Sequence, residues 1–378
     1  MKWLQKRLDE LGSVSRGRSR HRPRDATHLY GGPHPFIQTG DVKHAGLYVT
    51  GFTQTYTEAG LQQSKLWPAG TLCITIAANI ADTAILGMDA CFPDSVIGFI
   101  ANPAQADTRF VKYLFDATIK VKAQQFSQGA TQDNLSQEKL LSLGFDVPPA
   151  VEQTRIADIL SNYDDLIENN RRRMALLEES ARLLYREWFV RLRFPGYEHT
   201  PIVDGVPQGW EKAPLESAMV LQRGFDLPTQ DRQVGDVPIY GSTGILGYHD
   251  KIKAIAPSVV TGRSGTLGEV QYVAEDYWPL NTALWVKEFK RVTPLFALFL
   301  LREMDLKQFN GGASVPTLDR KSVHRVEILI PAASMLRSFD EFVSDVFMQI
   351  KNLSTQNQKL RAARDLLLPR LMSGELAV

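Results

Sequence analysis

Residues 160–188 read LSNYDDLIENNRRRMALLEESARLLYREW, and this stretch decides the fold. Its seam positions advance alternately by three and four residues, which is the heptad pattern of a helix that packs along another helix. These positions are Leu160, Tyr163, Ile167, Asn170, Met174, Leu177, Ala181, Leu184 and Trp188. A helix from about Ile156 to Arg191 is roughly 50 Å long, which is longer than a small domain is wide.

The same register returns 183 residues later (343 − 160). The second seam consists of Val343, Val346, Ile350, Leu353, Asn357, Leu360, Arg364 and Leu367. Asn170 and Asn357 interrupt the two seams, and a polar residue at such a position fixes register and orientation at a cost in stability. We expect the seams to pair with each other, antiparallel if an approximate two-fold axis relates the halves of the chain. The alternative is a helical hairpin packed against the core of its own domain.

The rest of the chain also contains an internal duplication. Gln125-Phe126, Gly129-Ala130 and Val147-Pro148 recur, 183 residues on, as Gln308-Phe309, Gly312-Ala313 and Ile330-Pro331. With small gaps, Trp3 and Leu8 match Trp210 and Leu215, and Phe92-Pro93 matches Trp278-Pro279. The offset falls from 207 (210 − 3) to 186 (278 − 92) to 183, so variation is concentrated in the first half of each copy. Recognition surfaces are usually built where loops vary, so we expect two sites on a common scaffold.

Between the helical patterns lie short apolar runs broken by Gly, Pro and Asn, which predict strands. They are residues 72–76, 96–100, 259–260, 283–286 and 326–330, and helices are predicted at 110–115 and 295–304. The fold class is therefore α+β, with two pseudo-symmetric α/β units separated by two long antiparallel helices in a coiled coil. The predicted parts are residues 1–150, 151–193, 194–332 and 333–378.

Composition is that of a globular protein, with 378 residues of which 44% are hydrophobic and 22% charged. No apolar run approaches the length that spans a bilayer, and Met1-Lys2-Trp3-Leu4 begins no signal-peptide stretch, so a cytoplasmic location is expected. Cys73 and Cys91 are interpreted as small core residues. A metal site with histidines of the same domain is the alternative, although no pair has ligand spacing.

A net charge of +1 argues against a protein that coats nucleic acid through its overall field, but the charge is uneven. Arginines alternate with other residues at Arg16, Arg18, Arg20, Arg22 and Arg24. This segment is either a solvated, poorly ordered arm or an arm that contacts phosphates.

Two glycine-rich loops in the second copy are candidate binding loops. They are residues 241–247 and 261–268, and Arg263 lies between two glycines of the second. Glycine lets backbone amides approach an anion, and arginine can bind a phosphate or the O6/N7 edge of guanine with two parallel bonds. Tight turns between strands are the alternative. The first copy has Ile76-Ala-Ala-Asn-Ile80 in place of the arginine loop, so the two copies are expected to bind different things.

Signals for catalysis are weak. Asp276 with Glu288-Phe-Lys290 fits a metal-dependent nuclease pattern loosely, and Val147-Pro-Pro-Ala150 has the prolines of a methyltransferase loop without its flanks. Neither a P-loop nor a Gly-x-Ser-x-Gly motif is present. We therefore expect no catalytic centre in this chain.

Several segments together resemble the specificity subunits of type I restriction-modification systems. They are Val147-Pro-Pro-Ala-Val-Glu-Gln-Thr-Arg-Ile156, Gly209-Trp210, the loop 261–268 and the ending Leu367-Leu-Pro-Arg-Leu-Met-Ser-Gly-Glu-Leu376. The resemblance covers the whole chain. It implies two target recognition domains that each read one half of a split, asymmetric sequence in double-stranded DNA, with the helix pair setting the gap. Inserting one heptad into a single helix is then expected to alter that gap.

The resemblance also implies partners. Two methylation subunits would dock on the helical regions, and two motor-nuclease restriction subunits would join them. S-adenosylmethionine, ATP and Mg²⁺ would then bind to these partners, and the methylation subunits would methylate adenine. The residues expected in the docking and spacer helices are Glu152, Gln153, Leu160, Ile167, Leu177, Leu184, Trp188, Ile350, Leu360 and Leu367. The second copy departs from the first in having Met335-Leu336 where Glu152-Gln153 stand.

The proposed mechanism is direct readout in the major groove by loops of each unit, with Lys and Arg on the phosphates. The DNA-contact candidates are Arg263, Ser242, Thr243, Lys251, Thr266, Ser314, Lys43, Asn79, Thr131 and Gln132. Ser314 and Thr131-Gln132 come from a third loop present in both copies, 128–132 and 311–315. Tyr48, Tyr56 and Tyr248 could stack on an extruded base or be ordinary sheet tyrosines. A coiled-coil scaffold that binds other proteins is the second interpretation, and a nuclease is the third.

Overall fold

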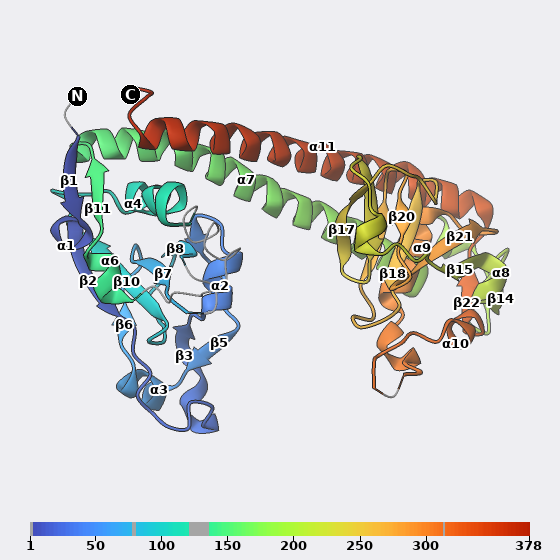
Figure 1. Ribbon diagram of the computed structural model, residues 1–378. Helices are drawn as coiled ribbons and strands as arrows, with labels where there is room; N and C mark the ends of the chain where they lie inside the picture. The colour runs from blue at the N-terminus through green and yellow to red at the C-terminus, as the bar shows by residue number, and fades with distance from the viewer. Residues whose placement is uncertain (1–2, 78–80, 121–135, 313) are drawn as a thin grey trace. The chain divides into compact units, whose positions relative to one another are not determined.

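The computed structural model describes residues 3–77, 81–120, 136–312 and 314–378 (Figure 1). The chain divides into two compact units. Unit one is Met1–Arg172 with Leu353–Val378, and unit two is Arg173–Asn352. Each unit therefore contains a globular part together with one end of each long helix, α7 (Ala150–Tyr185) and α11 (Ala333–Met372).

In the described residues, the globular part of unit one contains two larger β-sheets and one strand pair. One has the strand order β2 (Gly12–Arg16), β10 (Val96–Ala101), β7 (Leu72–Thr75), β8 (Thr83–Leu86) and β4 (Tyr48–Val49). The other has the order β5 (Gln54–Tyr56), β3 (Tyr30–Phe36), β9 (Ala90–Cys91) and β6 (Leu66–Trp67). A separate pair is β1 (Leu4–Arg7) with β11 (Gly144–Val147). The helices are α1 (Leu8–Leu11), α2 (Thr39–His44), α3 (Glu58–Gln63), α4 (Thr108–Phe115) and α6 (Gln137–Leu141), with single-turn segments η1 (Thr27–Leu29) and η2 (Asp116–Lys120).

Unit two repeats this plan. Its first sheet has the order β15 (Met219–Arg223), β21 (Ala283–Phe289), β18 (Ser258–Gly262) and β19 (Val270–Val273), and its second has β17 (Gly244–His249), β16 (Val237–Gly241) and β20 (Trp278–Pro279). The separate pairs are β14 (Glu211–Pro214) with β22 (Glu327–Ile330) and β12 (Ile202–Val203) with β13 (Val206–Pro207). The helices are α8 (Leu215–Ala218), α9 (Pro294–Glu303) and α10 (Arg320–His324), with short turns η3 (Arg186–Val190), η4 (Tyr197–His199), η5 (Thr229–Asp231) and η6 (Leu306–Phe309).

The duplication predicted from the sequence is confirmed by strand pairing. The order β2-β10-β7-β8 in unit one corresponds to β15-β21-β18-β19 in unit two. The second sheet of each unit includes a short strand that pairs in parallel with its neighbour. This pair is β9 with β3 in unit one and β20 with β16 in unit two. The predicted strands and the two predicted helices, in α4 and α9, are all present. The second sheets were not predicted, because strands such as Tyr30–Phe36 are rich in Gly and Pro and show no apolar alternation.

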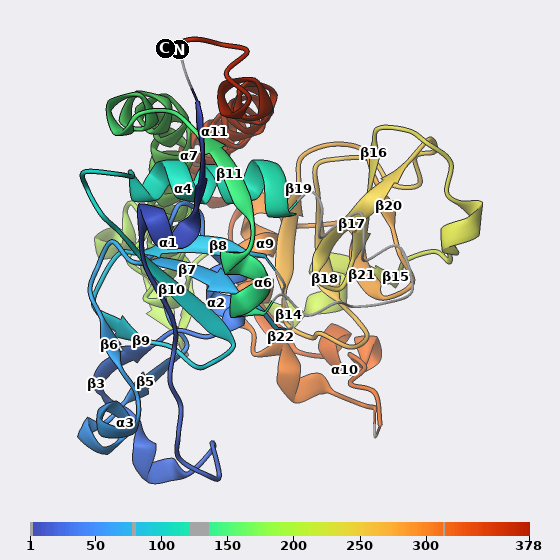
Figure 2. The same ribbon diagram turned by 60° about the vertical axis from the view of Figure 1, so that its left-hand side comes forward.

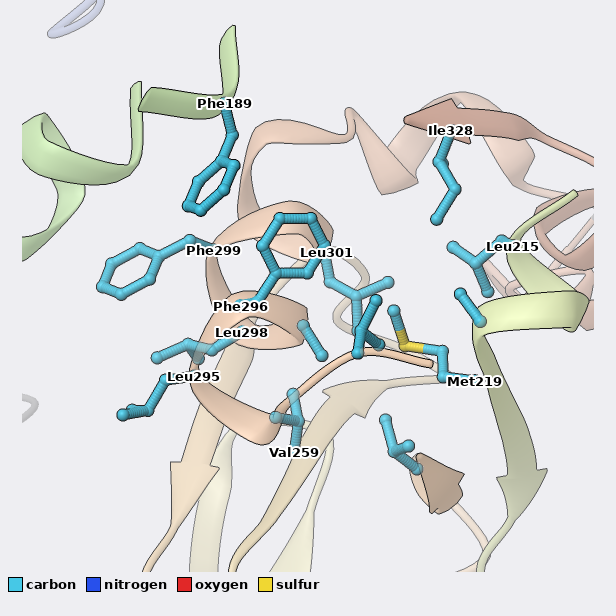
Figure 3. Packing of buried hydrophobic residues seen from close by; sticks show 14 of the residues in the cluster. Phe189, Leu215, Met219, Val259, Leu295, Phe296, Leu298, Phe299, Leu301 and Ile328 are labelled. Atoms are coloured by element: carbon cyan, nitrogen blue, oxygen red, sulfur yellow. The ribbon is translucent and has the colours of Figure 1, made fainter. Parts of the chain in front are cut away.

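The core of unit two is built around α9, which reads PLFALFLLRE and is buried along most of its length. Figure 3 shows Leu295 of this helix on the side of Val259 from β18, and Phe296 on the side of Phe189, whose ring lies 4.9 Å from it. The rings of Phe296 and Phe299 lie 5.5 and 5.7 Å from that of Tyr185 near the end of α7. Each fully buried aromatic side chain contributes roughly 1.5–3 kcal/mol, so this cluster joins the globular part of unit two to its helix ends.

Helices α7 and α11 run antiparallel, and the two views show them side by side (Figures 1 and 2). In unit one, the Asn170 side-chain amide donates to Asn357 Oδ1 at 3.0 Å, and the Asn357 amide donates to the Ile167 carbonyl at 3.1 Å. In unit two, the Trp188 ring lies 6.0 Å from that of Phe339. The predicted seams are confirmed, since every seam position is buried or half-buried. Helix α7 begins at Ala150, earlier than expected, because the Pro149 carbonyl already accepts from Glu152 and Gln153.

Among the residues that the structure describes, no helix has the length and apolar character needed to cross a membrane.

A buried histidine makes the stability of unit two depend on pH. The Leu221 amide donates to Nε2 of His324 at 3.0 Å, and burial lowers the pKa of this imidazole. Because the unfolded chain binds the proton first, the free energy of unfolding is expected to fall as the pH drops below the ordinary value of about 6.5 toward the lower folded pKa, and to stay reduced below it.

Urea unfolding between about pH 7.5 and about pH 5.5 measures this effect. His324→Gln keeps an acceptor but does not titrate, so it should remove that part of the pH dependence. The exposed His199→Gln is the control and should behave like the parent protein. If His324→Gln unfolds with the parental pH dependence, the imidazole is not the titrating group.

Candidate nucleic-acid interface

Three loops of unit two meet at one edge of its first sheet. A Cβ on Gly262 would lie 2.0 Å from the Thr266 carbonyl oxygen and 2.9 Å from that of Ser242, so the two glycine-rich loops touch through backbone and require glycine there. A third loop, residues 314–318, joins them, since the Gly265 amide donates to the Pro316 carbonyl at 3.0 Å and the Leu318 amide to the Arg263 carbonyl at 2.8 Å. These three loops are called the unit-two loop cluster below.

The loop cluster collects five of the residues predicted to contact DNA. They are Ser242, Thr243, Arg263, Thr266 and Ser314. Thr243, Thr266 and Ser314 are exposed, whereas Ser242 is half-buried in the two-residue turn between β16 and β17. Hydroxyl groups and backbone amides so placed suit phosphate oxygens or base edges.

Arg263 is half-buried and held in place. Its amide donates to the Thr282 carbonyl at 2.9 Å, and its Nη1 donates to the Asn281 carbonyl at 3.1 Å. Within the described part of the chain no carboxylate forms an ion pair with its guanidinium, and the nearby Asp226 pairs with Arg223 instead. Its remaining donors make it a candidate for a bidentate contact.

Lys251 lies elsewhere. It follows β17, whose last residue His249 pairs with Val237, whereas the Ser242-Thr243 turn is at the other end of that strand. A strand of this length spans roughly 20 Å, so Lys251 does not belong to the loop cluster. The hairpin instead exposes Ile245, Leu246 and Tyr248.

In unit one the candidates are less complete. Lys43 is exposed on α2. Asn79, Thr131 and Gln132 lie outside the described residues, as does the sequence repeat at Gln125-Phe126 and Gly129-Ala130. Tyr56 cannot stack on an extruded base, because it is fully buried with its ring 4.0 Å from that of Phe36. Tyr48 and Tyr248 are the exposed members of the tyrosine set.

The basic segment at residues 16–24 is fixed to unit one, which corrects its interpretation as a poorly ordered arm. The Gly17 amide donates to the Val96 carbonyl at 2.8 Å. Arg24 Nη2 donates to both carboxylate oxygens of Asp94, at 3.0 and 2.9 Å. The alternating arginines do not predict these contacts, because the residues that bind the segment are far away in the sequence.

Sequence reasoning missed a duplicated Arg-Gly pair. Arg16-Gly17 ends β2 and Arg223-Gly224 ends β15, with the same offset of 207 (223 − 16) that relates Trp3 to Trp210. A Cβ on Gly17 would lie 2.3 Å from the Pro93 carbonyl oxygen, and one on Gly224 would lie 2.1 Å from that of Leu280. Glycine is thus required at both places, and it sets an arginine at the same edge of both sheets.

The residues predicted for the helices are mostly interior. Glu152, Gln153, Leu160, Ile167 and Trp188 are buried, and Leu177, Leu184, Ile350, Leu360 and Leu367 are half-buried. The Gln153 side chain is bonded within its own unit, because its amide donates to the Pro148 and Gln105 carbonyls (2.9 and 3.0 Å) and its Oε1 accepts from the Asp107 amide (3.2 Å). The exposed large apolar residues of the two long helices are others, namely Val151, Leu166, Leu176, Leu183, Phe342, Met348 and Leu366.

Residues of the weak catalytic patterns have other partners. Asp276 accepts from the Ala256 amide at 2.9 Å, and Lys290 Nζ donates to the Glu216 carbonyl at 3.0 Å. Burial raises the pKa of the Cys73 and Cys91 thiols, as expected for core residues. Across the described ranges, no three side chains of His, Cys, Asp or Glu are grouped to hold a metal.

The model of the type I restriction modification DNA specificity domain matches residues 1–179 and 207–361, which is once over each unit. The chain belongs to this family. The two matches coincide with the two copies seen in the fold, and the Thr261–Gly268 loop of this specificity chain lies within the second. Recognition of DNA is the role of the family, and the loop cluster is where this chain places its variable, hydroxyl-rich and arginine-bearing loops.

Relatives of this specificity chain are similar over most of their length. It is 26% identical over 413 positions to the type I restriction enzyme MjaIX specificity subunit of Methanocaldococcus jannaschii, covering 100% of this chain and 94% of the relative. It is 21% identical to the HindI specificity subunit of Haemophilus influenzae, covering 66% and 72%. The crystal structure of the type I restriction-modification S subunit from M. genitalium has the same fold, with a TM-score of 0.60, 15% identity, and coverage of 98% and 96%.

Proposed function

We propose that this specificity chain reads a bipartite, asymmetric DNA sequence, with unit one on one half and unit two on the other. The observation that carries the proposal is one strand order used twice with unlike loops. A common scaffold places two binding edges in equivalent positions, while the arginine loop is present in unit two and replaced by Ile76-Ala-Ala-Asn-Ile80 in unit one. Different loops on equivalent edges suit two different half-sites.

DNA recognition and spacing are assigned to the four predicted parts of the chain. Residues 1–150 and 194–332 are proposed to be the target recognition domains, and 151–193 and 333–378 the spacer helices. The compact units cut across these parts because each takes one end of both helices.

We assign no catalytic step to this chain. Methylation of adenine and cleavage would be carried out by two methylation subunits and two motor-nuclease subunits in the cytoplasm. We propose that DNA is contacted by the five residues of the loop cluster, by Lys43 and Lys251, and by the three candidate residues outside the described ranges. Their roles are proposals.

Exposed leucines on α7 supply a docking surface for a methylation subunit. Leu176 and Leu183 are 70% and 50% exposed, and seven residues separate them, so both lie on one face of the helix in unit two. Solvent-exposed aliphatic side chains on an otherwise charged helix often indicate a protein–protein interface.

Replacing both with Glu should abolish co-purification with the methylation subunit and leave the fold intact, because neither side chain is in the core. Ala175→Glu is the control, since Ala175 is exposed on the same helix but lies about a quarter turn around it from Leu176 and Leu183. Undiminished co-purification of the double variant would place the docking surface elsewhere.

The function is tested by mapping methylated adenines in a host that produces this chain with its partner subunits. A split motif with a fixed central gap supports the proposal. A contiguous motif, or none, contradicts it. The scaffold alternative is distinguished by salt, because binding through several phosphates weakens steeply as salt rises whereas binding to proteins through apolar surfaces does not.

A further inference from the structure

Four polar side chains form a connected cluster beside the unit-two loop cluster. Asp226 accepts from Arg223 Nη2, which lies 3.0 and 3.3 Å from its two carboxylate oxygens. Asp226 also accepts from the Asn281 side-chain amide. The backbone carbonyl of Asn281 accepts from Arg263 Nη1 at 3.1 Å. One carboxylate is thus tied directly to one guanidinium and, through Asn281, to a second.

The backbone fixes the positions of these residues. The Asn281 amide donates to the Phe225 carbonyl at 3.0 Å, and the Phe225 amide donates to the Pro279 carbonyl at 2.8 Å. Between Arg223 and Phe225, Gly224 approaches the Leu280 carbonyl too closely for any side chain. The cluster is therefore held by two chain segments that run parallel and are joined by a β-bridge between Phe225 and Leu280, and not by its own side-chain bonds alone.

The charges of the cluster are unequal. Hydrogen bonds from Asn281 and then from Arg223 lower the pKa of Asp226, so two guanidinium groups face one carboxylate. The side chains of Arg223 and Asp226 are 46% and 62% exposed, which leaves them accessible to a ligand. A partly neutralised arginine attracts phosphates less, but a guanidinium held in one orientation can still form two parallel bonds to the O6 and N7 of guanine.

Unit one has the arginine without this arrangement. Arg16 Nε donates to the backbone carbonyl of Asp94 at 2.9 Å, and the Asp94 carboxylate binds Arg24 instead. Ser19 occupies the sequence position that corresponds to Asp226 (226 − 207). The Arg-Gly pair is thus common to the two units. Among the described residues, a carboxylate binds the arginine of this pair in unit two but not in unit one.

Resting on the proposed function, we propose that Asp226 is a positioning residue that makes Arg223 and Arg263 readers of guanine rather than general phosphate contacts. The half-site read by unit two then contains a guanine whose recognition depends on this cluster. Removing the charge of Asp226 breaks its ion pair with Arg223 and leaves both guanidinium groups without a neighbouring carboxylate, which raises attraction to any DNA and lowers discrimination.

The test uses the complex of the full chain with its methylation subunits and a library of random-sequence DNA duplexes. In Asp226→Asn, preference for guanine in one half-site should fall roughly tenfold or more, and the other half should be unchanged. Binding to duplexes without the motif should strengthen, and the slope of log affinity against log salt should steepen by up to about one phosphate contact. A purely structural role would not strengthen binding.

Glu211→Gln is the matched control. Glu211 forms an exposed ion pair with Arg291 at 2.6 Å in the same unit, so the same charge is removed away from the loop cluster, and no change in guanine preference is expected. Arg223→Lys keeps the charge without the planar fork, so it should lose guanine preference and retain general DNA binding.

The outcomes separate the two proposals. If the parent complex selects a split motif and Asp226→Asn selects the same one with equal discrimination, the positioning role is wrong while the proposed function stands. If the parent selects no split motif, the proposed function fails. Should Asp226→Asn fail to fold, retention of guanine preference by Arg223→Lys would still overturn the inference.

Discussion

Inserting one heptad into each long helix is expected to lengthen the gap of the recognised motif by about three base pairs and leave both half-sites unchanged. Seven helical residues add roughly 10 Å, and base pairs in duplex DNA are about 3.4 Å apart. Duplicating residues 174–180 and 346–352 preserves the seam, and it leaves the Asn170–Asn357 pair in unit one and the Trp188–Phe339 contact in unit two unaltered. Both helices are lengthened because these contacts would oppose a change in one alone.

The gap is measured by selecting random-sequence duplexes with the full complex. An insertion of four residues in each helix is the control, because it moves the apolar positions off the seam and should abolish selection of a split site. Recovery of the parental gap from the heptad variant would show that the paired helices do not set the spacing.

Replacing Arg364 with Ala is expected to destabilise unit one by about 3–5 kcal/mol, because it leaves a buried carboxylate without its cation. Asp164 is 7% exposed, accepts from Arg364, and accepts from Tyr113 Oη at 2.6 Å. Burial together with the Asp164 charge raises the pKa of Tyr113, so the phenol stays a donor and cannot replace the cation. The triad joins α4 to both long helices within unit one.

Urea unfolding followed by hydrogen exchange of unit-one amides measures the loss. Arg172→Ala is the control, because its pair with Glu168 is exposed and is worth a few tenths of a kcal/mol. Adding Asp164→Asn to Arg364→Ala should recover part of the loss, since a neutral amide needs no counter-ion. Equal effects of Arg364→Ala and Arg172→Ala would mean that the triad does not stabilise the unit.

The features that could be predicted from the sequence are those with a short period or an internal copy. The seams follow from spacing alone, and so do their polar interruptions at Asn170 and Asn357, whereas the hydrogen bond between these two residues is known only from the structure. The duplication predicted equivalent units because it is visible as a fixed offset. Strand order then confirmed what the offset implied.

The features that could not be predicted depend on long-range pairing. The sequence pattern marked Gln153 as a residue shared with a family, but its burial comes from three hydrogen bonds to Gln105, Asp107 and Pro148, and these are set by the fold. The anchoring of the basic segment depends on Asp94 in the same way. Tyr56 is similar, because nothing in its neighbours shows that the ring is enclosed.

The candidate site was predicted in part. Arg263 and the hydroxyl residues of its loops were found because glycine-rich loops are visible in a sequence, and the structure brings five of them together. Arg223, Asp226 and Asn281 were missed because Asn281 lies far along the chain from the other two and neither segment carries a local motif. The offset of 207 would have revealed the Arg-Gly pair, but the carboxylate that binds Arg223 has no copy in unit one to reveal it.

The central claim is that two equivalent edges read two different half-sites. It is tested most directly by methylation maps of Arg16→Ala and Arg223→Ala, made in hosts that produce each variant with its partner subunits. The account predicts that each variant relaxes one half of the motif, that the two variants relax opposite halves, and that the gap stays constant. Relaxation of the same half by both variants, or of both halves by either one, would contradict it.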